Sequence, residues 1–238
     1  MISLLVGSAY GAQRAFSTGW ERVTRFSPAA WQAAKPAAGP APLANRLVLI
    51  VVDGLRPDET SLLPSLDRLR RLGSAYNLSA PGPSYQLPVS ATLLTGAQPQ
   101  THGVVLPTVT QPLQADSLFS AAARVRIPAG GVGQPGLGQL LGPTAGTWHN
   151  AGDAAALLAQ ARTLLAPTGP RLVLVQTNQL VTGRQEARSA DPASPSYKEV
   201  LGQVDAQLMQ MIELVDLKTA SVVVVGSTPT DAAGVHRA

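Results

Sequence analysis

Residues 46–54 read RLVLIVVDG, an apolar run that ends in an acidic residue and a glycine. Its consecutive aliphatic side chains leave no polar face, which is typical of a strand buried on both sides in a parallel sheet. Two further runs, residues 171–175 and 221–225, share this character. Helical spacing occurs between the runs, in residues 60–72, 116–125, 151–165 and 196–217. The alternation predicts an α/β fold, with a mainly parallel sheet sandwiched between helices.

A glycine-rich stretch precedes the third of these helical segments. Its members are Gly130, Gly131, Gly133, Gly136 and Gly138. They lack the Lys and Ser/Thr that complete a phosphate-cradling loop. We therefore interpret the stretch as a turn that leads into a short helix.

The composition is that of a folded domain. The chain has 238 residues, of which 45% are hydrophobic and 13% are charged, so it can bury a sizeable core. The absence of cysteine excludes a disulfide scaffold and a cysteine-based zinc module. The formal net charge of +4 arises in residues 1–73, because residues 74–238 hold equal numbers of basic and acidic side chains. With 4% aromatic residues and no basic stripe, nucleic acid is not predicted as a partner.

Residues 1–44 differ from the rest of the chain. Residues 1–12 are mostly apolar or small, but they are too few to span a bilayer, and no basic region precedes them as in a signal peptide. Basic residues and two tryptophans follow, and then an Ala/Pro-rich linker over residues 33–44. Two interpretations stay open, a membrane-proximal segment and an irregular leader. We expect the folded domain to comprise residues 45–238.

Ligands of open parallel sheets bind at the carboxyl ends of the strands. Three segments follow the predicted strands at that edge: Asp53-Gly54, residues 176–184 and residues 226–236. These segments are the candidates for a functional site.

Two of the motifs near this edge occur together in a known family. Residues 51–58 read VVDGLRPD and residues 93–104 read LLTGAQPQTHGV, with Pro64-Ser65-Leu66 between them. The combined pattern resembles the alkaline phosphatase superfamily, and within it the type I phosphodiesterase/nucleotide pyrophosphatase branch. The similarity runs from about Arg46 to the end of the chain. The resemblance implies an alkaline-phosphatase-like core, and because relatives generally continue further, we expect that core to be incomplete at its C-terminus.

Members of this family resemble two-metal hydrolases. Two zinc or similar ions, held by Asp and His, polarise a phosphoryl or sulfuryl ester that a Thr or Ser alkoxide attacks. The resemblance matches Asp53 to the first metal-binding Asp and His236 to the last His. The nucleophile position is Gln86, and an amide cannot form an alkoxide. An Asn that often follows the nucleophile corresponds to Val89.

The remaining four ligand positions of the family hold other residues in this chain. The Asp and His that follow the middle strand correspond to Leu180 and Arg184, and the Asp-His pair after the last strand corresponds to Ser227 and Thr228. Arginine has no lone pair to offer a cation. Two retained ligands would bind a divalent ion weakly, since catalytic zinc sites supply three protein donors. The resemblance thus implies a degenerate metal site with no catalytic residue.

Alternatives for single residues stay open. Asp53 followed by Gly54 would also suit a turn at a strand end. As a hypothesis, Arg184 supplies fixed positive charge near Asp53 and pairs with it. We interpret His102 as a structural hydrogen-bonding residue and His149 as a loop residue. Further hydroxyls that could replace the nucleophile show no base partner in the sequence: Ser84, Ser90 and Thr92.

The sequence leads to a functional hypothesis and two alternatives. We expect a phosphodiesterase-like domain that has lost its nucleophile and most metal ligands, needs no cofactor, and serves as a binding or assembly module for a protein partner or a membrane surface. Its location would then be membrane-associated or extracytoplasmic. The first alternative is a metal-dependent phosphoric or sulfuric ester hydrolase with a rearranged site, using zinc or another divalent cation. The second, a fragment of a longer protein, is compatible with either function.

Overall fold

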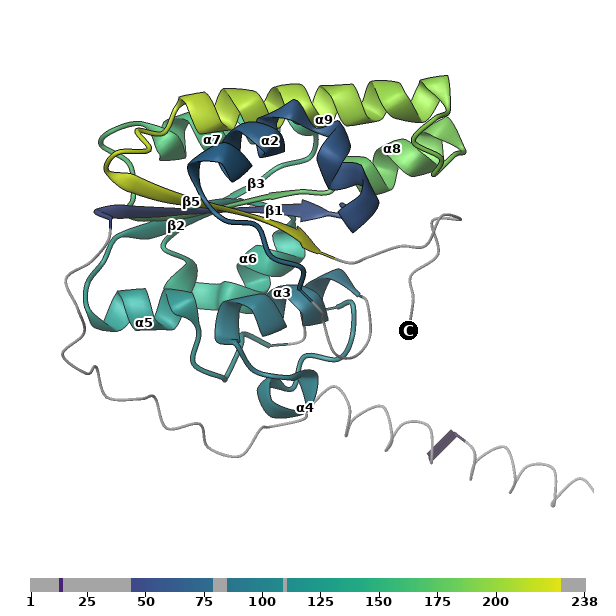
Figure 1. Cartoon of the computed structure of the whole chain (residues 1–238). Helices are drawn as coiled ribbons and strands as arrows, with labels where there is room; N and C mark the ends of the chain where they lie inside the picture. Colours follow the sequence, from purple (N-terminus) through teal and green to yellow (C-terminus); the bar gives the residue numbers. More distant parts are fainter. Residues whose placement is uncertain (1–12, 15–43, 79–84, 109–110, 228–238) are drawn as a thin grey trace, which may run out of the picture.

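The computed structural model describes residues 13–14, 44–78, 85–108 and 111–227. It contains a five-stranded sheet in the order β3-β2-β4-β1-β5, and every pair of neighbouring strands is parallel (Figure 1). The strands are β1 (Arg46–Asp53), β2 (Ala129–Gly133), β3 (Thr147–Asn150), β4 (Leu172–Thr177) and β5 (Ala220–Ser227). The predicted fold class is confirmed.

Helices cover both faces of the sheet (Figure 1). On one face lie α2 (Pro64–Leu72), α7 (Ala154–Leu165), α8 (Gln179–Ala187) and α9 (Pro195–Glu213), with the short helix η1 (Pro57–Leu62) leading into α2. On the other lie α3 (Gln86–Thr95), α4 (Pro99–His102), α5 (Leu118–Arg124), α6 (Pro135–Leu141) and η2 (Gly142–Ala145). Two hydrophobic cores result, one on each side of the sheet.

Strand β1 contributes to both cores because successive side chains of a strand point to opposite faces. Val48, Ile50 and Val52 pack into the core beneath α7 and α9, whereas Leu49 and Val51 pack into the core beneath α3 and α6. The strand pairs with β4 on one side and β5 on the other. Its apolar run is therefore buried on both faces, as predicted.

The predicted helices are present with shifted ends. The segment 60–72 is divided at Leu63, because Pro64 lacks a backbone N–H and begins a new helix at its first position. Helix α5 starts after Ser117, whose hydroxyl accepts a hydrogen bond from the Ser120 N–H at 3.1 Å. Helix α7 starts after Asp153, whose carboxylate caps it in the same way.

The interpretation of the glycine-rich stretch as a turn was wrong in its first half. Residues 129–133 form β2, an inner strand between β3 and β4, and only the second half begins the expected short helix, α6. A Cβ on Gly131 would lie 2.6 Å from the Trp148 ring and 2.7 Å from the Leu174 carbonyl oxygen. Glycine is needed here because the Trp148 indole of β3 packs directly on the β2 backbone. His149 accordingly lies in β3 and not in a loop.

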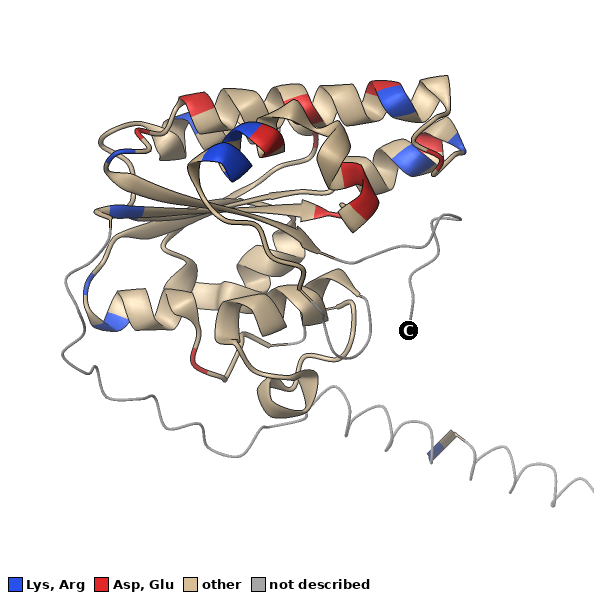
Figure 2. Cartoon of the chain, in the orientation of Figure 1, with Lys and Arg blue, Asp and Glu red and all other residues tan. Residues whose placement is uncertain are grey.

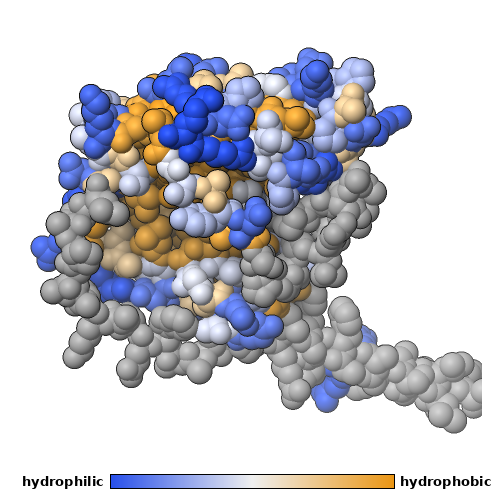
Figure 3. All heavy atoms as spheres, viewed as in Figure 1, coloured by the Kyte–Doolittle hydropathy of each residue, from blue (hydrophilic) through white to orange (hydrophobic). Residues whose placement is uncertain are grey.

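The two helical layers differ in charge, and hydrophobic side chains are exposed between them. Most charged residues lie in the layer of α2, α8 and α9, whereas the layer of α3 to α6 is nearly free of charge (Figure 2). The edge strand β5 is less covered than the inner strands, and Val223 is 42% exposed. Hydrophobic side chains are accordingly visible between the two helical layers (Figure 3).

Within the described ranges, no helix combines the length and the apolar character that crossing a bilayer requires. The predicted leader and linker fall almost entirely outside those ranges, and the domain boundary near residue 45 stays a prediction.

Candidate functional site

Asp53 is the last residue of β1, and its side chain is the centre of a buried polar cluster. The residue is 1% exposed. The Ser227 hydroxyl donates a hydrogen bond to Oδ1. The side-chain amides of Gln86 and Gln176 both donate to Oδ2, the latter at 3.2 Å. Both carboxylate oxygens are therefore engaged by uncharged donors.

The sheet brings these residues together. Ser227 is the last residue of β5 and lies directly beside Asp53 in the register of the two strands. Gln176 is near the end of β4, with its Oε1 accepting a hydrogen bond from the Gln134 N–H at 3.3 Å, which directs its amide nitrogen toward Asp53. Gln86 opens α3. The carboxyl edge was the predicted place for a site, and the cluster lies there.

Burial changes the acidity of Asp53. Removal from water raises the pKa of its carboxyl to about 7, and the hydrogen bonds from Ser227, Gln86 and Gln176 counteract that rise only in part. Near neutral pH a large share of the molecules then carries a proton on this side chain.

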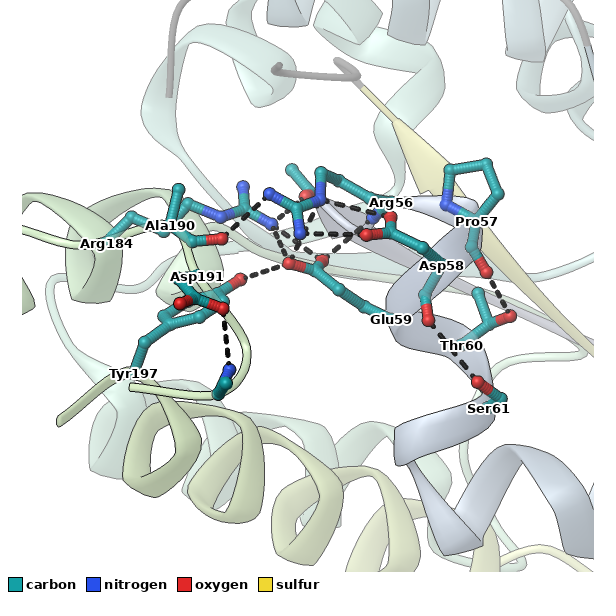
Figure 4. A network of polar contacts seen from close by, with 12 residues as sticks. Arg56, Pro57, Asp58, Glu59, Thr60, Ser61, Arg184, Ala190, Asp191 and Tyr197 are labelled. Carbon is teal, nitrogen blue, oxygen red and sulfur yellow. Dashed lines mark hydrogen bonds and ion pairs between the residues drawn. The ribbon is translucent and has the colours of Figure 1, made fainter. Parts of the chain in front are cut away.

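A second buried cluster is centred on Glu59 of η1 (Figure 4). It reaches the residue next to Asp53, because Arg184 donates to the Gly54 carbonyl. Glu59 is 0% exposed. Nη2 of Arg184 in α8 lies 2.9 Å from Glu59 Oε1 and 2.7 Å from Oε2. The hydroxyl of Tyr197 in α9 donates to Oε1 at 2.7 Å. Burial, with the adjacent Glu59 carboxylate, raises the pKa of Tyr197 well above its ordinary value.

Arg56 completes this cluster. Its backbone N–H donates to Glu59 Oε2 at 3.0 Å, and its Nε lies 3.3 Å from Oε1. Its guanidinium also pairs with Asp58 and donates to the Ala190 carbonyl at 2.9 Å (Figure 4). One buried carboxylate thus lies against two guanidinium groups and a phenol.

The hypothesis that Arg184 pairs with Asp53 is replaced by this arrangement. Arg184 is buried as expected, but its carboxylate partner is Glu59, and its contact beside Asp53 is a 2.6 Å hydrogen bond to the Gly54 carbonyl. Sequence reasoning missed Glu59. The available signal was its place six residues after Asp53, on the segment that leaves the carboxyl end of the first strand.

The other residues assigned by the resemblance lie in different surroundings. Leu180 of α8 is fully buried in the hydrophobic core beneath α9. Thr228 and His236 fall outside the described residues. Asp53 is more than a turn residue, because its carboxylate bonds to three side chains.

His102 and Thr92 form a hydrogen bond of 3.0 Å between Nε2 and Oγ1. The Val104 N–H donates to Nδ1 of His102 at 3.1 Å, so a neutral ring carries its proton on Nε2 and donates it to Thr92. Burial lowers the pKa of His102 to about 4, which keeps the ring neutral. His102 is a structural hydrogen-bonding residue, as predicted, and in this tautomer it cannot act as a base toward Thr92.

Ser90, the other described hydroxyl of this set, does not offer an activated nucleophile either. Ser90 is buried, and its Oγ has no hydrogen-bond partner among the described residues. Ser84 lies outside the described residues.

The described residues at the carboxyl edge do not fit the dinuclear zinc centre that the resemblance implies. Among the described residues, no three His, Asp or Glu side chains are grouped so that they could hold a metal ion. The neighbours of Asp53 present N–H and O–H donors to it, where a metal centre needs further lone pairs. Arg184, which the resemblance aligns with a ligating His, carries a positive charge that repels a cation.

Comparison with known proteins agrees with the fold. Residues 47–125 match the family model for type I phosphodiesterase / nucleotide pyrophosphatase. Similar solved structures include phosphonoacetate hydrolase from Sinorhizobium meliloti in complex with phosphonoacetate, with 18% identity and a TM-score of 0.60 over 77% of this chain and 56% of that chain. They also include an inactive variant of murine ectonucleotide pyrophosphatase / phosphodiesterase 5 in complex with AMP, with 15% identity and a TM-score of 0.60 over 78% and 57% of the two chains. The human protein of the same name has 14% identity and a TM-score of 0.55, over 77% and 57%.

The predicted resemblance to the type I phosphodiesterase / nucleotide pyrophosphatase family is thereby confirmed over residues 47–125. The chain spans a little over half the length of these solved structures, and at such low identity the likeness shows the fold alone. The comparison with curated proteins gives no match.

Proposed function

We propose that this phosphodiesterase-like domain does not hydrolyse esters and acts as a binding or assembly module. The observation that carries the proposal is the saturation of Asp53. Its two oxygens accept hydrogen bonds from Gln86, Gln176 and Ser227, so a cation could reach them only after these side chains turned away. Buried polar groups that satisfy one another in this way form a stable unit.

The position of Gln86 supports the same proposal. The resemblance assigns this position to the nucleophile, and the Gln86 amide donates to Asp53. An amide cannot replace a Thr or Ser alkoxide in forming a covalent phosphoryl intermediate. The nearby hydroxyl of Thr92 is hydrogen-bonded to a neutral His102. Thr92, the nearby described hydroxyl considered as a substitute, therefore has no base partner in His102.

The electrostatics of the edge also disfavour a metal-dependent hydrolase. Two ions a few ångströms apart need several anionic or imidazole ligands. Asp53 is the carboxylate of its cluster, and the Glu59 carboxylate is already balanced by Arg184 and Arg56. To bind Glu59, a divalent cation would have to displace the Arg184 guanidinium, which is part of the protein itself.

Metal analysis combined with an activity assay tests the proposal. The purified protein is incubated with zinc, desalted, analysed for bound metal, and assayed with a nitrophenyl phosphodiester and with phosphonoacetate, the ligand in the similar Sinorhizobium enzyme. We expect no stoichiometric zinc and no turnover above that of an Asp53→Ala variant. About two bound ions, with turnover that Asp53→Ala abolishes, would contradict the proposal and favour the rearranged hydrolase.

A binding module requires a partner, and we propose a protein or a membrane surface in a membrane-associated or extracytoplasmic location. Co-sedimentation with vesicles separates the two classes. Binding to vesicles that disappears when residues 1–40 are deleted would support the membrane surface, whereas no binding to vesicles of any composition would favour a protein partner.

A further inference from the structure

The buried guanidinium of Arg184 is a fixed cation at the carboxyl edge of the sheet. We propose that it performs, as part of the chain, the charge-balancing and cross-linking role of a metal ion, so that this edge is held together without metal. Arg184 would stabilise the fold in this way whether or not the Asp53 cluster has any activity.

Charge balance is the first argument. Glu59 is 0% exposed, and a buried carboxylate is unstable without a countercharge. Arg56 shares its own charge with Asp58, to which it makes two hydrogen bonds of 3.1 and 2.9 Å. Arg184, which is 5% exposed, approaches both Glu59 oxygens. Arg184 is therefore a buried counterion of Glu59 that engages both carboxylate oxygens.

Cross-linking is the second argument. A metal ion joins segments that are distant in the chain by collecting their oxygen ligands, and Arg184 collects oxygens in the same way. Its Nη2 donates to the Gly54 carbonyl after β1 and to the Glu59 carboxylate in η1, while its guanidinium carbon lies 5.2 Å from the centre of the Tyr197 ring of α9. Through one side chain α8 is thus bound to the end of β1, to η1 and to α9 (Figure 4).

The backbone beside Asp53 is adapted to this guanidinium. Gly54 has a φ of 80°, which favours glycine, and a Cβ at this position would lie 2.7 Å from Arg184 Nη1. Asp53 and Gly54 therefore face two different clusters. The Asp53 carboxylate accepts from uncharged donors, while the next carbonyl accepts from Arg184. The Arg184 guanidinium therefore belongs to the Glu59 cluster and not to the Asp53 cluster.

Thermal unfolding of charge variants tests the proposal. Arg184→Gln removes the charge but keeps hydrogen-bonding capacity, and Arg184→Lys keeps the charge. Because breaking a buried ion pair is strongly destabilising, we expect Arg184→Gln to lower the unfolding midpoint by on the order of 10 °C. Arg184→Lys should lower it clearly less. The midpoint of the unchanged protein should not move when EDTA or zinc is added.

Two further measurements keep the test decisive if Arg184→Gln does not fold. The double variant Glu59→Gln/Arg184→Gln has no unpaired buried charge, so it should be more stable than either single variant. An Arg184→Ala variant should regain part of its midpoint in millimolar methylguanidinium, which can enter the vacated space. Arg71→Ala, which removes an exposed arginine of α2, is the matched control and should change the midpoint little.

Any of three results would overturn the proposal. The first is a midpoint of the unchanged protein that falls with EDTA, which would show that a bound metal stabilises it. The second is an Arg184→Gln variant as stable as the unchanged protein. The third is an Arg184→Lys variant no more stable than Arg184→Gln, which would show that charge is not what the position provides.

Discussion

Replacing Asp53 by asparagine removes an ionisable carboxyl from a buried cluster while keeping its shape. Burial raises the pKa of this carboxyl from 3.8 to about 7, a shift of about three pH units. Each unit corresponds to about 1.4 kcal/mol, so the shift is equivalent to at most about 4 kcal/mol in the free energy of unfolding. The asparagine amide can still accept from the Gln amides and donate to the Ser227 hydroxyl after local reorientation.

The direction in which stability changes with pH follows from the pH at which the folded and the unfolded state each lose the proton of Asp53. Below about pH 4 the carboxyl is protonated in both the folded and the unfolded state, and it causes no pH dependence. Between about pH 4 and pH 7 the unfolded chain loses the proton first, so the folded state becomes progressively less stable. Above about pH 7 both states have lost the proton, and this group changes the stability no further. Asp53→Asn should therefore gain stability relative to the unchanged protein as the pH rises from 4 to 8.

Urea unfolding at intervals from pH 4 to pH 8, with EDTA present, measures the effect. The quantity of interest is the difference in free energy of unfolding between Asp53→Asn and the unchanged protein. Other groups cancel in this difference, among them His102, whose lowered pKa gives a slope of opposite sign between about pH 4 and 6.5. Gln114→Ala, at an exposed position and without a titratable group, is the control and should give a nearly constant difference. Parallel pH profiles of Asp53→Asn and the unchanged protein would refute the reasoning.

Three further substitutions test local features of the structure. Gly54→Ala should lower the free energy of unfolding by about 1–3 kcal/mol in urea titrations, because of the positive φ and the contact with Arg184; an unchanged midpoint would contradict that contact. Gly131→Ala should cost about 1–3 kcal/mol through its contacts with the Trp148 ring and the Leu174 carbonyl, and Trp148→Leu in the same chain should recover only the part due to the ring. Burial lowers the pKa of His102 to about 4, so stability should fall as the pH drops below about 6.5; His102→Asn should reduce this fall, and an identical acid profile would argue against the buried neutral ring.

Much of the fold could be predicted from local pattern. The apolar runs at residues 47–52, 171–175 and 221–225 became β1, β4 and β5, because a strand buried on both faces needs an uninterrupted apolar sequence. Strand β2 was missed because its sequence, AGGVG, has little strand propensity. Its glycines are explained only by the Trp148 ring that packs on them, and that contact joins residues from two different strands.

The site was predictable in place and only partly in detail. Asp53 and Gln86 were singled out through the resemblance to the phosphodiesterase family, and the structure joins them by a hydrogen bond. Gln176 lay within a segment selected for inspection, but nothing in its local sequence showed that its amide would face Asp53. Glu59 was missed because an acidic residue in the first turn of a helix is usually solvated.

The sequence by itself determined the order of buried strands and amphipathic helices, the resemblance to phosphodiesterases, and the residue types that stand at positions such as 180 and 184. These properties depend on residue type and on spacing along the chain. Only the tertiary structure decided which charge pairs with which. Arg184 binds Glu59, 125 positions away, because the parallel sheet and the packing of α8 on β1 bring these segments together at a buried edge, where an unpaired charge would not be tolerated.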